Sequence, residues 1–202
     1  MHRHAIPDID LRNRLAYEHG LECHLLMSSR NQQSPAFPAS LCAELSPLLQ
    51  SAYGLTPTPA HFQYETWAVT LRSPNCAPVA CLTLGFRSSF PSYFSARFEA
   101  VEPSRQRQGL GRLLFECAAV WARFLVLNDP LAMHGVLQSD GDYCLVAYID
   151  ADPDFEDNQY SHGRFLRKLG FVRAQHDFGQ TEDEIAFQRA YHVPLEREDE
   201  AD

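Results

Sequence analysis

The chain has 202 residues, 45% of them hydrophobic and 21% charged, which is an ordinary globular composition of a length that suits one sizeable domain. No apolar run approaches the length of a membrane span, so we expect no membrane insertion. The formal net charge of −9 disfavours nucleic acid as a partner and favours a cationic one, such as an amine or a basic peptide.

The N-terminal region combines polar and amphipathic segments. Residues 1–20 are interpreted as a polar extension with a short helix near 9–19, and they lack the apolar core of a signal peptide. Residues 21–27 predict a first strand. Apolar residues at helical spacing predict a helix over 40–53, which Pro47 is expected to divide into two short helices.

The next part of the sequence predicts strands. Residues 66–72 and 79–86 are rich in β-formers and are separated by a turn, so we expect an antiparallel pair. A further strand over 93–101 would place residues on alternate faces. One face would carry Phe94, Ala96, Phe98 and Ala100, and the other Ser95, Arg97, Glu99 and Val101. Three consecutive polar positions on one face of a central strand favour a cleft or paired charges there.

A polar loop with two closely spaced glycines, Gly109 and Gly111, follows this strand and leads into an apolar helix over 109–127. Glycine lets the backbone approach a ligand closely, and the first turn of a helix offers unpaired N–H groups at the positive end of the helix dipole. The sequence therefore predicts a phosphate-binding loop. The spacing fits neither the nucleotide P-loop nor the dinucleotide fingerprint.

The C-terminal half alternates strands and helices. Residues 128–142 are expected to form a loop, either a functional flap or an insertion. A strand over 143–149 would lie parallel to strand 93–101, joined to it by a right-handed crossover through the helix. A helix over 154–169, strands over 171–178 and 184–192, and an acidic tail over 193–202 complete the prediction.

The cysteines are scattered and form no Cys-x-x-Cys pair, so we interpret them as reduced core thiols of a cytoplasmic protein rather than a disulfide framework. No residues have zinc-ligand spacing, and no metal is predicted. The six are Cys23, Cys42, Cys76, Cys81, Cys117 and Cys144.

The pattern Gln106-x-x-Gly109-x-Gly111 resembles the acetyl-coenzyme A motif of the GNAT superfamily of N-acetyltransferases. The resemblance extends to the order of elements over residues 21–192, and residues 164–171 are similar to a second family motif. It implies an α/β fold with a mixed sheet whose two central parallel strands splay apart. It divides the chain into the extension 1–20, the domain 21–192 and the tail 193–202.

The same resemblance implies how a coenzyme binds. The backbone at Ala100 and Val101 would pair with the pantetheine arm of acetyl-CoA. The diphosphate would lie on the loop, with Gln106 at the leading position of the motif. The amides expected to hold it belong to Arg107, Gln108, Gly109, Leu110, Gly111 and Arg112.

Direct acetyl transfer to an amine, without a metal, needs a base and an acid. The positions where relatives carry a glutamate or histidine base hold Ser95 and Arg97 here, so Glu99 is the candidate base. The alternative for Glu99 is an ion pair with Arg97.

The family's usual tyrosine acid falls on Leu166, which cannot donate a proton. Tyr148 is the candidate acid, and the alternative is a tyrosine packed against a helix. Solvent protonation of a departing thiolate would need neither.

The sequence thus favours an acetyl-CoA-dependent N-acetyltransferase acting on an amine of a small molecule or a protein. A non-catalytic acyl-CoA-binding module and a structural α/β domain stay open as alternatives. The acceptor, the acyl chain length and the oligomeric state are not fixed by the sequence, which is compatible with a homodimer.

Overall fold

The computed structural model describes residues 2–27, 39–62, 65–89, 91–150, 156–175, 177–181 and 184–194. Contacts between residues divide it into two compact units. Unit 1 comprises Met1–Phe86 and Ser95–Phe124, and unit 2 comprises Arg87–Phe94 and Leu125–Asp202. Within the described ranges, no helix is both long and apolar enough to cross a membrane.

Unit 1 is built on strands in the order β1-β2-β3-β4-β5. Antiparallel pairing joins β1 to β2, β2 to β3 and β3 to β4, which confirms the hairpin predicted for the last two. The strands are β1 (His2–Ala5), β2 (Glu22–Met27), β3 (Trp67–Arg72), β4 (Pro78–Arg87) and β5 (Ser92–Val101). The helices are α1 (Ile9–Arg14), a π-helical turn (Leu15–His19), α2 (Ala39–Tyr53), 3₁₀ turns at Pro59–Phe62 and Pro103–Arg105, and α3 (Leu110–Asn128).

The N-terminal residues form a strand and helical turns that pack on unit 1, whereas the sequence predicted a polar extension with one short helix. The helix predicted near 9–19 is present, and the Asp8 side chain caps it by accepting a hydrogen bond from the Leu11 amide at 2.8 Å. Strand β1 was not predicted. It adds an edge to the sheet, and Ile6, Leu11 and Leu15 are buried. Apolar side chains in a mainly polar segment therefore anchor it to unit 1.

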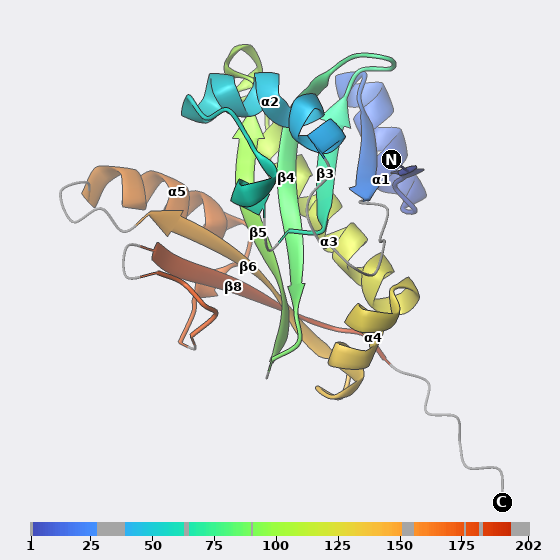
Figure 1. The fold of residues 1–202 in the computed structure, drawn as a ribbon, viewed down its shortest axis with the longest axis vertical. Helices are drawn as coiled ribbons and strands as arrows, with labels where there is room; N and C mark the ends of the chain where they lie inside the picture. The colour runs from blue at the N-terminus through green and yellow to red at the C-terminus, as the bar shows by residue number, and fades with distance from the viewer. Residues whose placement is uncertain are drawn as a thin grey trace, which may run out of the picture. The chain divides into compact units, whose positions relative to one another are not determined.

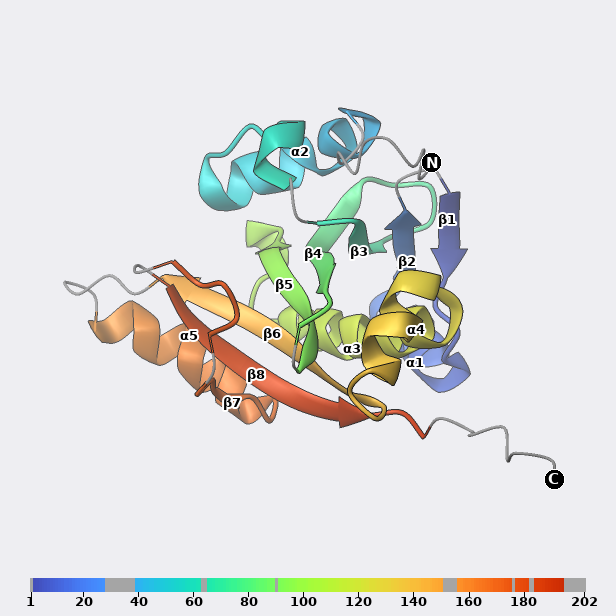
Figure 2. The same ribbon diagram turned by 60° about the horizontal axis from the view of Figure 1, so that its bottom comes forward.

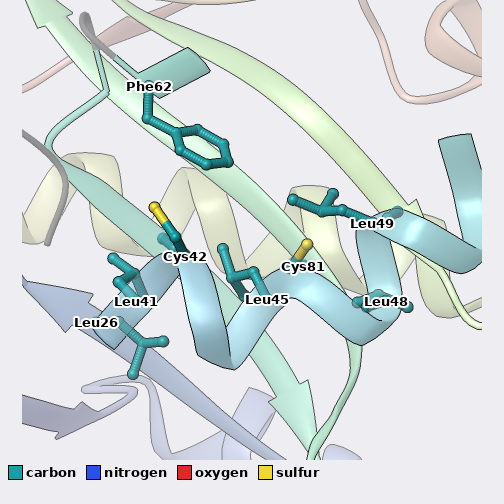
Figure 3. Packing of buried hydrophobic residues seen from close by; sticks show 10 residues of the cluster. Leu26, Leu41, Cys42, Leu45, Leu48, Leu49, Phe62 and Cys81 are labelled. Carbon is teal, nitrogen blue, oxygen red and sulfur yellow. The ribbon is translucent and has the colours of Figure 1, made fainter. Parts of the chain in front are cut away.

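Helix α2 is continuous, so the predicted break at Pro47 is wrong. Figure 2 shows α2 on one face of the strands of unit 1 and α3 on the other. Four leucines of α2 turn toward the sheet, and Figure 3 shows them around Phe62 and Cys81. Burial of these side chains offsets the one backbone hydrogen bond that proline cannot make. The leucines are Leu41, Leu45, Leu48 and Leu49.

Five of the six free cysteines are buried, as predicted for core thiols, and Cys76 alone is exposed. Burial raises the pKa of the Cys81 thiol to about 12. Such a thiol stays protonated at physiological pH and behaves as a small apolar side chain.

Unit 2 contains strands in the order β6-β8-β7. Strand β6 (Asp142–Asp150) pairs antiparallel with β8 (Glu184–His192) along its whole length, and β7 (Val172–Arg173) pairs with β8. Strand β7 is much shorter than the 171–178 segment predicted. The rings of Phe94 and Tyr143, both in unit 2, meet edge to face at 5.9 Å.

The segment 128–142, predicted as a loop, carries helix α4 (Pro130–Leu137). Asp129 caps this helix by accepting hydrogen bonds from the amides of Leu131 and Ala132, both at 3.1 Å, and Pro130 occupies the first helical position. The prediction of a loop is therefore wrong for Pro130–Leu137, which are helical.

Helix α5 (Glu156–Lys168) lies against β6 and β8 (Figure 1). Gly163 allows the close approach, since a Cβ atom there would stand 3.2 Å from the Phe187 ring and 3.7 Å from Ile149. Leu166 is buried, and Gly170 follows the helix with φ of +84°, as predicted for its stop.

Candidate functional site

Strand β5 has an irregular backbone conformation at Phe98, where φ is +47°. This left-handed conformation is rare for a bulky residue and marks an irregularity in the strand. Around it, carbonyl groups of β5 accept bonds from side chains: Thr83 Oγ1 donates to Arg97 at 2.9 Å, and Tyr53 donates to Glu99. The Phe98 ring lies edge to face on Phe62 at 4.9 Å.

The residues of the predicted polar face of β5 differ in burial. Ser95 is buried and donates to the Gly85 carbonyl at 3.2 Å, so it serves the sheet and not a cleft. Arg97 and Glu99 are only partly buried. Ala100 is buried in the same cluster as the leucine side chains of α2, as expected for the apolar face of β5.

Glu99 has the ionisation behaviour expected of a candidate base. Loss of hydration raises its pKa to about 8. A dominant ion pair with Arg97 would instead lower the pKa of the carboxyl, so loss of hydration outweighs any such pairing. A base with a pKa near the operating pH is well matched to removing a proton from an amine.

The loop after β5 turns sharply toward α3. It contains the 3₁₀ turn at Pro103–Arg105, and Arg107 and Gly109 have φ of +63° and +81°. Residues 106–109 are exposed, and a Cβ atom at Gly109 would meet nothing within 4 Å. The backbone here is therefore accessible to a ligand.

The first turn of α3 offers the amides that were predicted to hold a diphosphate. Leu113 makes the first i→i−4 bond, from its amide to the Gly109 carbonyl at 3.1 Å. The amides of residues 109–112 precede that bond and lie at the positive end of the helix dipole. This arrangement is suited to an anion.

Both glutamines of the motif support the loop. Gln106 Nε2 donates to the Val101 carbonyl at 3.3 Å, and Gln108 Nε2 donates to the Ser104 carbonyl at 3.3 Å. Gln106 thus ties the start of the loop to the end of β5. Its side chain holds backbone in place, which the motif alone did not indicate.

Arg112 lies in the first turn of α3 and is engaged along the helix. Its Nε donates to Glu116 Oε1 at 2.8 Å, and the other oxygen of Glu116 pairs with Arg14 of α1. Sequence reasoning gave no role to Arg14 or Glu116. The i, i+4 spacing of Arg112 and Glu116 was a readable signal for their pairing, whereas Arg14 lies about a hundred residues away.

Tyr148, the candidate acid, belongs to unit 2 and shares an acceptor with Tyr93. Tyr148 donates to the Phe178 carbonyl at 2.8 Å, and Tyr93 donates to the same oxygen at 2.7 Å. A carbonyl has two lone pairs and accepts both. The two hydroxyls therefore hold the backbone at Phe178 in place. The hydrogen bond of Tyr93 was not predicted from the sequence.

Glu99, Ala100, Val101 and the loop 106–112 all belong to unit 1. Leu166, where the sequence resemblance would place a tyrosine acid, is buried in α5 and carries no proton to donate. Among the described residues, no group of three or more His, Cys, Asp and Glu could hold a metal ion.

No protein-family model matches the chain, and no curated protein does. An acetyl-CoA-bound GNAT family acetyltransferase from Elizabethkingia anophelis matches in structure with a TM-score of 0.50 at 13% identity, covering 87% of this chain and 99% of that one. A Lactobacillus plantarum protein, provisionally assigned as an N-acetyltransferase, gives 0.50 at 10% identity, with coverages of 85% and 97%. At these identities the similarity concerns the fold, and it confirms the predicted fold class.

Proposed function

The chain has the GNAT acetyltransferase fold, and from this premise we propose that it transfers an acetyl group from acetyl-CoA to an amine. The observation that carries the proposal is the exposed loop at 106–109 together with the start of α3, where amides precede the hydrogen-bond ladder of the helix. A diphosphate is complementary in charge to this group of donors. The open space around Gly109 leaves room for it.

The proposed coenzyme site uses backbone more than side chains. The amides of residues 107–112 bind the diphosphate, while Gln106 keeps the loop attached to β5 through the Val101 carbonyl. The backbone of Ala100 and Val101 orients the pantetheine arm. When bound, acetyl-CoA supplies an acetyl group activated as a thioester.

Glu99 is the proposed base. In its ionised form it takes a proton from the ammonium form of the acceptor, so that the nitrogen lone pair attacks the thioester carbonyl carbon. The carbon–sulfur bond then breaks, the nitrogen loses its second proton as the amide forms, and the thiolate receives one proton. Because loss of hydration raises the pKa of Glu99 to about 8, half of this carboxyl is ionised at that pH, and the fraction of active base falls as the pH is lowered from it.

The acceptor is proposed to be an amine that is cationic before reaction. The net charge of −9 favours the approach of such a molecule. The free, mostly buried cysteines fit a reducing compartment, and we place the protein in the cytoplasm on that ground.

A second candidate function is an acyl-CoA-binding module without catalysis. Two observations favour it: Leu166 replaces the family's tyrosine, and the proton of Tyr148 is directed at the Phe178 carbonyl. In a catalytic protein the thiolate would then take its proton from solvent or from a Tyr148 released from Phe178.

Measuring coenzyme A binding and thiol release on the same preparation separates these functions. Acetyl-CoA is incubated with a panel of primary amines, and free thiol is followed against a sample without amine. Amine-dependent release supports the transferase. Binding without release supports the module, and the absence of binding refutes both.

A further inference from the structure

Arg112 stands where a helix ordinarily disfavours a cation. The first turn of α3 contains no acidic residue, although the dipole favours negative charge there. The Arg112–Glu116 pair also runs in the less favourable direction, with the cation N-terminal to the anion. A cation at this position is stabilised only by a nearby anion, and Glu116 supplies one in the structure.

Glu116 is shared between two guanidinium groups. Arg112 binds one of its oxygens and Arg14 the other, so the cluster of Arg14, Arg112 and Glu116 carries one excess positive charge. Arg112 is the exposed member, with 69% of its side chain accessible, against 39% for Arg14 and 27% for Glu116. The Nε atom of Arg14 is buried, so this side chain is the more fixed of the two cations.

On the basis of the proposed coenzyme site, we propose that Arg14 is a positioning residue. It makes the Arg112 guanidinium easier to transfer from Glu116 to an incoming diphosphate. Arg14 neutralises Glu116 from the side of α1. The attraction between Glu116 and Arg112 is correspondingly weaker, and the Arg112 guanidinium exchanges from Glu116 to the ligand at lower cost. The N-terminal segment thereby contributes to coenzyme affinity without touching the coenzyme.

Removal of Arg14 and removal of the charge of Glu116 are expected to change coenzyme affinity in opposite directions. Without Arg14, Glu116 is left with one cation and holds Arg112 more tightly, so coenzyme binding weakens. Without the charge of Glu116, Arg112 is released and coenzyme binding strengthens. Once Glu116 is neutral, the charge of Arg14 no longer matters for Arg112.

The test is calorimetric titration of coenzyme A into the full chain and three variants, R14Q, E116Q and the double variant. Exposed ion pairs typically contribute a few tenths to one kcal/mol, so we expect R14Q to weaken binding about threefold and E116Q to strengthen it about threefold. The double variant should match E116Q, and R14K should restore wild-type affinity. R3Q, which removes an exposed arginine paired with Glu44 elsewhere in unit 1, is the control and should change nothing.

Melting temperatures separate affinity from folding. An R14Q variant that loses stability but keeps its affinity for coenzyme A would overturn the inference, as would E116Q with unchanged affinity or a double variant whose effects simply add. A purely structural role for the cluster would not make E116Q bind more tightly. If the wild-type protein fails to bind coenzyme A at all, the proposed function falls together with this inference.

Discussion

The carboxyl of Glu99 is the residue on which the proposed chemistry depends. A base must be ionised to act, and loss of hydration raises the pKa of this one to about 8. The rate should therefore rise with pH up to about 8 and level off above it.

Glu99→Gln should lower turnover about a hundredfold or more at pH 8, within the range typical of general bases. The decrease should be smaller at pH 6, where the wild-type carboxyl is mostly protonated. Glu18→Gln, which alters an exposed carboxyl, is the control and should keep the wild-type profile. Identical pH profiles for wild type and E99Q would assign Glu99 to structure.

The same raised pKa predicts a pH-dependent stability. In the unfolded chain the carboxyl loses its proton near the ordinary value of 4.5, whereas in the folded protein it keeps the proton up to about 8. The folded state binds more protons over this interval, so Glu99 lowers stability progressively as pH rises through it.

E99Q should therefore melt higher than wild type at pH 9 and close to wild type at pH 4.5. The difference between pKa values of 4.5 and about 8 corresponds to about 5 kcal/mol at about 1.4 kcal/mol per unit, so a difference on the order of 10 °C is expected at pH 9. Thermal melts at the two pH values check this. A difference of the same size at both would contradict burial as the cause.

At the scale of elements, the start of α3 is the feature that matters for coenzyme binding. Gly109→Asp should abolish binding of coenzyme A, because a carboxylate would face the diphosphate. The positive φ of Gly109 adds strain for any side chain. Gly20→Asp is therefore a matched control, since Gly20 also has positive φ and open space around it. Equal losses of affinity in both variants would indicate strain instead of charge.

The packing of α2 on the sheet of unit 1 can be tested by truncating one of its buried side chains. Leu45 is fully buried beside Phe62 (Figure 3), and Leu45→Ala should cost about 2–5 kcal/mol of unfolding free energy. Leu127 is half exposed, so Leu127→Ala should cost about 0.5 kcal/mol or less. Denaturant titrations measure both. Equal costs would contradict the packing of α2 on the sheet.

Elements with a strong local pattern could be predicted from the sequence, and elements decided by tertiary contacts could not. The apolar spacing of α3 and the β-rich runs of β3, β4 and β8 identified those elements. The helix break predicted at Pro47 was wrong, because burial of the α2 leucines outweighs the one backbone hydrogen bond that proline cannot make. Helix α4 was missed although Asp129 and Pro130 form a readable start signal.

The candidate site was predictable to a similar extent. Two closely spaced glycines indicated a turn that leads into a helix, which the structure contains, and phosphate binding at this loop stays a prediction. The positive φ of Phe98 and Arg107 was not predictable, since these residues rarely adopt it without tertiary support. The partners of Arg14 and of Tyr93 are distant in sequence, and only the folded chain brings them to Glu116 and Phe178.

At the scale of the whole molecule, fold similarity and local chemistry contribute separate evidence. The solved structures share the fold at 10–13% identity, which leaves the reaction to be argued from residues. The residues supply an exposed amide-rich loop and a carboxyl of raised pKa in unit 1, together with a tyrosine pair in unit 2. Coenzyme binding is the property on which every part of the proposal depends.

Calorimetric titration of the full chain with coenzyme A and, separately, with pantetheine tests that property most directly. The two ligands share the thiol arm, and only coenzyme A carries the diphosphate. We predict saturable heat with coenzyme A and binding at least about tenfold weaker with pantetheine, since charge-assisted bonds to the loop amides are then missing. Absence of heat with coenzyme A, or equal affinity for both ligands, would contradict the account.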